Sequence, residues 1–186
     1  MVRSIVTTSN MPSTLQFASE KYEKGEYACA IELFESLAKL GNADAKTYLT
    51  EIYWRVQDHK CLKRAAQLQE ELNSLYKPST SAYQLGIFRE ALMLLEEADD
   101  SRNKRLNSLF VDLKNSQYDR NLLLAASMAK SNRIAEENRC SPLFLYMKAF
   151  ARASRVKQKI WILGLITLEV LNPSKKPTTV FPRTIK

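Results

Sequence analysis

Hydrophobic residues recur every three or four positions along most of the chain, from about residue 13 to residue 171. This spacing places apolar side chains on one face of a helix, so it predicts a series of amphipathic α-helices. Gly25 and Gly41 interrupt the pattern as helix C-caps do, and Pro78 stops it again. The clearest predicted helices cover about residues 13–23, 27–40, 45–56, 61–75 and 82–95.

The pattern of the C-terminal part predicts further helices. Two shorter ones are expected within residues 103–131, and Ser141-Pro142 is a typical helix start. Four basic residues follow at helical spacing: Lys148, Arg152, Arg155 and Lys159. We therefore expect the helix that starts at Pro142 to continue through them and to carry all four on one basic face. The apolar run 160–171 is too short to span a bilayer core of ~30 Å, so it predicts a buried helix. Trp161 within it is expected in the core or in a dimer contact.

A motif recurs on the first, third and fifth predicted helices. Phe17-Ala18, Leu49-Thr50 and Leu85-Gly86 occupy the same slot, at spacings of 32 and 36 residues. Around the first slot, small and aromatic residues match the tetratricopeptide helix–turn–helix unit: Ala18, Tyr22, Gly25-x-Tyr27, Ala30, Phe34 and Leu37. The joint 41–45, followed by Tyr48-Leu49 and Ile52-Tyr53, resembles the Sel1-like subclass. The resemblance extends over about 100 residues and is most specific over about 40.

This resemblance implies an all-α fold, a right-handed α-solenoid of roughly four stacked antiparallel helix pairs. We expect one helical-repeat domain over residues 13–172, preceded by a flexible segment at 1–12. Residues 173–186 contain three prolines and no helical period, which predicts an extended or disordered tail. The sequence leaves open whether Met1 or Met11 is the native start.

Composition leaves little material for chemistry. The 186 residues include one His and three Cys, and the thiols of Cys29, Cys61 and Cys140 lack the paired spacing of a zinc site. Neither a nucleophile elbow nor a phosphate-binding glycine loop is present. We therefore expect a non-enzymatic protein with no metal and no cofactor. The N-terminus lacks a secretory signal pattern, so we expect reduced, mostly buried thiols in a cytoplasmic protein.

The net charge of +8 is concentrated in the second half of the chain. Residues 94–186 contain 17 Lys/Arg and 9 Asp/Glu, whereas residues 1–93 contain 11 of each. Within the last 41 residues, nine basic groups accompany a single acid, Glu169. This asymmetry indicates that the C-terminal end meets an acidic partner, unless it serves only as a solubilising end.

The resemblance also implies where a partner would bind, since the first helix of each pair lines the concave groove of such arrays. Trp54 is the preferred anchor, because the adjacent Tyr53 already fills the packing position. The favoured function is a protein–protein interaction adaptor that holds a peptide or helix of another protein, possibly acidic, in this groove. The expected groove residues are Tyr22, Thr47, Glu51, Trp54, Arg55, Tyr83 and Ile87.

Two alternatives remain open on the sequence. The first is a module that binds nucleic acid or an anionic surface through the basic face. Nucleic acid is the weaker of these two ligands, because no aromatic residues interleave with the basic ones as in single-strand binders. The second alternative is a homodimer formed through residues 160–171. The basic face comprises Lys148, Arg152, Arg155, Lys157 and Lys159.

Overall fold

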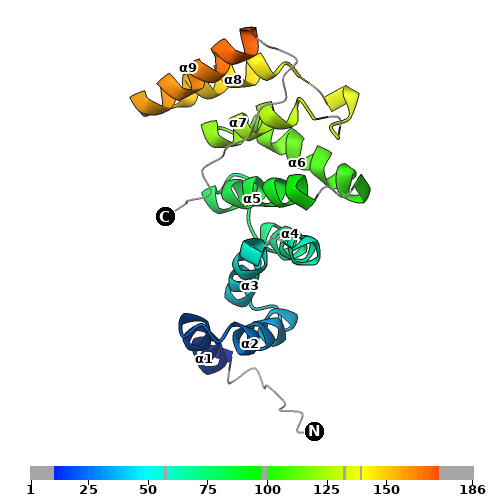
Figure 1. Cartoon of the computed structure of the whole chain (residues 1–186), viewed down its shortest axis with the longest axis vertical. Helices are drawn as coiled ribbons and strands as arrows, with labels where there is room; N and C mark the ends of the chain where they lie inside the picture. The colour runs from blue at the N-terminus through cyan, green and yellow to red at the C-terminus, as the bar shows by residue number, and fades with distance from the viewer. Residues whose placement is uncertain (1–10, 57, 98–99, 132, 139, 172–186) are drawn as a thin grey trace. The chain divides into compact units, whose positions relative to one another are not determined.

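The computed structural model describes residues 11–56, 58–97, 100–131, 133–138 and 140–171 (Figure 1). All regular elements in these ranges are helices, so the all-α class is confirmed. The chain divides into two compact units, 1–76 and 77–186, which are described separately below. The segments expected to be flexible or extended, 1–12 and 173–186, lie outside the described residues, except that Met11 and Pro12 are helical.

The first unit contains four helices in sequence: α1 (Met11–Glu23), α2 (Tyr27–Lys39), α3 (Ala43–Val56) and α4 (His59–Asn73). Helix α1 packs on α2, α2 on α3, and α3 on α4 (Figure 1). All four helices lie close to the positions that the hydrophobic spacing predicts. Apolar periodicity and short turns are therefore sufficient to position this unit's elements along the chain.

Two glycines end helices in the first unit. Gly25 and Gly41 have φ angles of 78° and 87°, a left-handed conformation that glycine adopts without strain. After each, a backbone N–H reaches back five residues to a helix carbonyl, as in the Schellman motif. At the start of α3, Asn42 Oδ1 accepts the Ala45 N–H at 2.8 Å. An amide oxygen at this position satisfies one of the helix's free N–H groups.

The core of the first unit combines small and large side chains. Ala18, Ala30 and Ala38 are buried, as the close approach of the helices requires, and Phe34 fills the space between them. One polar group ties three helices together: Glu35 on α2 accepts hydrogen bonds from Tyr53 on α3 at 3.0 Å and from Arg64 on α4. This network fixes the orientation of α3 relative to its neighbours.

Burial alone would raise the pKa of the Glu35 carboxyl, but the hydrogen bonds from Arg64 and Tyr53 hold it below its usual value. Burial, reinforced by the hydrogen bond to Glu35, raises the pKa of Tyr53 to about 12. At neutral pH the network therefore pairs a carboxylate with a neutral phenol and a guanidinium.

The second unit contains five α-helices within its described residues: α5 (Ser81–Glu97), α6 (Asn103–Asn115), α7 (Asp119–Met128), α8 (Pro142–Arg152) and α9 (Val156–Leu171). Short 3-10 turns precede α6 and α8, η2 (Asp100–Arg102) and η3 (Glu136–Asn138). Each α-helix packs on the next one along the chain. Thr80 Oγ1 accepts the Tyr83 N–H and so caps the start of α5.

The end of the second unit corrects two predictions. Helix α8 stops at Arg152, Ala153 is extended with ψ 125°, and α9 begins three residues later. The expected basic face of one continuous helix therefore does not exist. Helix α9 was expected to be buried, yet only Ile162 and Glu169 are buried in it. Helix α8 packs on one side of α9, which is the last helix that the structure describes (Figure 1). Among the described residues, no helix combines the length and apolar character needed to cross a membrane.

Candidate functional site

The expected groove residues divide between the two units. Tyr22 lies on α1, and Thr47, Glu51, Trp54 and Arg55 lie on α3, all within the first unit. Tyr83 and Ile87 lie on α5 in the second unit. The two sets are therefore examined as separate surfaces.

Three tyrosines meet on the surface of the first unit. The ring of Tyr22 contacts Tyr27 edge-on, with centroids 5.5 Å apart, and contacts Tyr48 in the same way at 5.9 Å. Tyr48 in turn stacks on Phe34, with centroids 4.7 Å apart and planes within 6°. Phe34 is fully buried, whereas Tyr27 is 55% and Tyr48 37% exposed. The three rings thus form an aromatic surface that is anchored to the core.

A charged pair lies beside these rings. Arg55 Nη2 donates to Glu51 Oε1 at 2.6 Å, one helical turn away, and both side chains are exposed. The hydrogen bond to Glu51 is the largest cause that raises the pKa of Arg55, followed by the nearby Tyr22 hydroxyl, with Tyr27 also contributing. Glu51 and Arg55 follow Tyr48 at helical spacing, so they lie on the same face of α3 as its ring. We call this surface the tyrosine face; it comprises Tyr22, Tyr27, Tyr48, Glu51 and Arg55.

Two further expected residues lie on the adjoining side of α3, at helical spacing from one another. Thr47 is exposed, and its hydroxyl donates to the Ala43 carbonyl at 3.0 Å. Trp54 is half-buried, so less of its indole is available than an exposed anchor offers. The structure thus brings Tyr22, Glu51 and Arg55 together, and Trp54 is not the centre of the surface.

Tyr27 and Tyr48 are surface residues that the sequence analysis missed as binding candidates. Tyr27 was assigned to the turn after Gly25, and Tyr48 to the packing pattern of its helix. The available signal was a tyrosine on each of three consecutive helices, near the end of α1, at the start of α2 and in the middle of α3. It is visible only once α1, α2 and α3 are known to converge.

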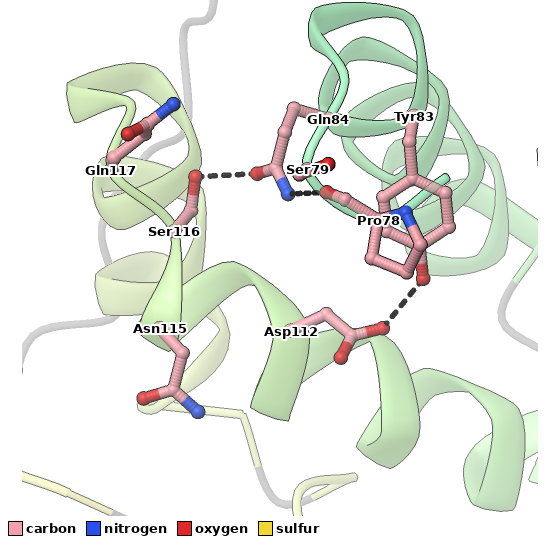
Figure 2. A pocket seen from close by; sticks show the side chains of 8 residues that line it. All are labelled: Pro78, Ser79, Tyr83, Gln84, Asp112, Asn115, Ser116 and Gln117. Carbon is pink, nitrogen blue, oxygen red and sulfur yellow. Dashed lines mark hydrogen bonds between the residues drawn. The ribbon is translucent and has the colours of Figure 1, made fainter. Parts of the chain in front are cut away.

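In the second unit, Tyr83 lines an open polar pocket of about 330 Å³ (Figure 2). Its hydroxyl donates to Asp112 Oδ2 at 3.0 Å, while Ser116 Oγ donates to Gln84 Oε1 at 2.6 Å. Burial, and then the nearby Asp112 charge, raise the pKa of Tyr83, so its hydroxyl stays protonated. These polar groups bond to one another, which makes the pocket a weak candidate for catalysis. Its lining residues are Pro78, Ser79, Tyr83, Gln84, Asp112, Asn115, Ser116 and Gln117.

The expectation that Ile87 points into a groove is wrong. Ile87 is fully buried, because α5 packs against both α6 and α7 and no free side remains at this position. The side chain belongs to the hydrophobic core of the second unit.

The basic residues near the C-terminus have separate local roles. Lys148 Nζ donates to the Lys114 carbonyl at 2.8 Å, and Arg152 Nη1 donates to the Ser116 carbonyl at 2.9 Å. Both cations thus satisfy carbonyls at the C-terminal end of α6, where the helix dipole favours positive charge. Lys159 lies over the Phe150 ring, 5.6 Å from its centroid. Only Arg155 and Lys157 of the predicted basic face are exposed without a contact of this kind.

The three thiols are dispersed. Cys29 is exposed, contrary to the expected burial, whereas Cys61 and Cys140 are half-buried. Burial raises the pKa of the Cys61 and Cys140 thiols, which disfavours the reactive thiolate. In the part of the chain that the structure describes, no three His, Cys, Asp or Glu residues are grouped to hold a metal ion.

Comparison with known protein families, with curated proteins and with solved structures finds no significant match for this chain.

Proposed function

We propose that this protein is a non-catalytic adaptor that binds a segment of another protein on the tyrosine face of its first unit. One observation carries the proposal: the Tyr22 ring contacts the rings of Tyr27 and Tyr48 on two other helices, and an exposed Arg55–Glu51 pair lies one and two helical turns after Tyr48 on the same face of α3. Tyrosine and arginine dominate binding hot spots, because they offer a large apolar area, a polar tip and little entropy loss on binding.

The chemistry of the tyrosine face indicates the kind of segment it takes. The exposed ring edges of Tyr27 and Tyr48 offer apolar contact, and their hydroxyls offer hydrogen bonds. Arg55 pairs with one exposed carboxylate, that of Glu51. An exposed ion pair of this kind contributes little free energy in water. A carboxylate of the partner can therefore displace Glu51. We expect an acidic segment with an apolar side chain next to its carboxylate.

The packing of α1 on α2 and of α3 on α4 supports a wider interpretation, in which the chain is a tetratricopeptide-like or Sel1-like solenoid of stacked helix pairs. In such an array, groups at the ends of successive helices converge on one surface without any catalytic machinery. The step from this arrangement to an adaptor role in the cytoplasm is an analogy, because repeat folds serve many functions.

Site-specific photocrosslinking tests the proposal. The photoreactive residue benzoylphenylalanine replaces Tyr27 in one sample and Tyr76 in a matched one, and both proteins are irradiated in lysate of the source cells. Tyr76 is a suitable control, because it is an exposed tyrosine of the same unit, 41% against 55%, away from the ring cluster. We expect a discrete crosslinked protein from position 27 that is absent at position 76.

A charge-reversal variant completes this experiment. Arg55→Glu should reduce the crosslink from position 27, since it places a negative charge where the partner's carboxylate would sit. Equal crosslinking from positions 27 and 76, or a crosslink unchanged by Arg55→Glu, would contradict binding on the tyrosine face.

A further inference from the structure

Helix α9 has an apolar side that is exposed among the described residues of the second unit. Each of the large side chains on this side is at least 46% exposed. We call this surface the outer side of α9; it comprises Val156, Ile160, Trp161, Leu163, Leu168, Val170 and Leu171. Protein surfaces seldom expose a contiguous apolar area of this kind unless it makes a further contact.

The acidic residue of α9, Glu169, lies on the buried side of the helix, so the outer side carries no negative charge. Ile162 is fully buried against the rest of the unit, and Glu169 is 8% exposed and ion-paired with Lys130. Glu169 is the only acid between Val156 and Leu171. Its carboxylate faces inward and is already neutralised.

Positive charges flank the outer side at both ends of the sequence. Arg155 and Lys157 are exposed at the N-terminal end of α9. After α9, residues 172–186 include four more basic residues and no acid. The surface therefore combines a large apolar area with an uncompensated positive charge.

We propose that the outer side of α9 lies on an anionic lipid surface. The helix would rest in the plane of the interface, because its inner side is packed on α8 and only its outer side is free. Its apolar side chains would enter the boundary between headgroups and acyl chains, with Trp161 at the depth that this residue type prefers. Arg155 and Lys157 would then meet the lipid phosphates and carboxylates.

Charge favours lipid over a second copy of the chain as the occupant. A dimer through α9 would bury the apolar side chains, but it would add a second set of cations and no exposed acid of α9 to meet them. An anionic bilayer supplies both the apolar medium and the counter-charge. The proposal concerns the second unit, so it stands or falls separately from the tyrosine face of the first.

Vesicle flotation with the full chain tests this proposal. Phosphatidylcholine vesicles are compared with vesicles that also contain phosphatidylserine, at low and high NaCl. We expect flotation only with the anionic vesicles, and weaker flotation at high salt. Ile160→Gln/Leu168→Gln should lower the partition coefficient by about 10-fold or more, because two apolar side chains no longer enter the bilayer. Arg155→Glu/Lys157→Glu should lower it by a similar factor.

Val56→Gln/Leu75→Gln is the matched control, since these residues of the first unit are 58% and 59% exposed, against 65% and 60% for Ile160 and Leu168. This control should float like the wild type. In a Trp54→Phe background, brominated lipid should quench the fluorescence of Trp161. Circular dichroism verifies that each variant is folded.

Three results would overturn the proposal. The first is an absence of flotation with anionic vesicles at low salt by the folded wild type. The second is equal flotation with neutral vesicles that the charge reversal leaves unchanged. The third is a dimer, detected by light scattering, that dissociates in Ile160→Gln/Leu168→Gln, because a second copy would then cover this side.

Discussion

The ion pair between α5 and α6 should respond very differently to single and double substitution. Glu90 is fully buried, and its two carboxylate oxygens accept hydrogen bonds from Arg105 Nε at 2.6 Å and Nη2 at 2.8 Å. Arg105→Met removes both bonds and leaves a buried carboxylate without its cation. Truncation of one partner of such a buried pair costs about 3–5 kcal/mol of folding free energy.

Glu90→Leu/Arg105→Met should recover most of that loss, because an apolar pair of similar volume has no desolvation cost. Urea unfolding, followed by circular dichroism, measures both variants, together with Glu90→Leu to complete the double-mutant cycle. Arg55→Met is the control: it breaks an exposed pair and should change stability by less than ~1 kcal/mol. A loss below ~1 kcal/mol for Arg105→Met, or a double variant as unstable as Arg105→Met, would refute the reasoning.

Two further predictions concern the first unit. Asp58 accepts the Lys60 and Cys61 N–H groups at the start of α4, so Asp58→Ala should cost about 1 kcal/mol, seen as a fall in Tm of about 2–4 °C, while Asp58→Ser should retain most of the stability. A Tm unchanged by Asp58→Ala would contradict this role. The pKa of Glu35 is lowered in the folded state, so its contribution to stability is present above the ordinary value of 4.5 and is lost as the pH falls. Glu35→Gln should therefore lose less stability than the wild type between about pH 5 and pH 3 in urea unfolding, and parallel losses would count against the network.

The helices of this protein were largely predictable from sequence, because local signals determine them. Hydrophobic spacing defined the helical segments, and Gly25 and Gly41 ended two of them through backbone conformations that other residues adopt only with strain. The break between α8 and α9 was missed. It occurs at Ala153 and Ser154, which carry no glycine or proline signal.

The surfaces were harder to predict, because they depend on contacts between distant residues. Lys148 and Arg152 seemed free on a helical wheel, yet the carbonyls they bind belong to residues 34 and 36 positions earlier in the chain. The helical pattern also indicated an exposed position for Ile87, but the packing of α6 and α7 on α5 buries its side chain. Tyr22, Glu51 and Arg55 lie on the described surface of the first unit, and their role in binding stays a prediction. The exposed tyrosines between them were not identified, since only the packing of three helices brings those rings together.

The affinity of the protein that crosslinks at position 27 tests the proposed function most directly. Isothermal titration calorimetry would compare the wild type with Tyr27→Ala and with the control Tyr76→Ala. A Kd at least about 10-fold weaker for Tyr27→Ala, with Tyr76→Ala within about twofold of the wild type, is the result expected of a tyrosine hot spot. Equal affinities for all three proteins would show that the partner binds elsewhere and would contradict the tyrosine face as its binding site.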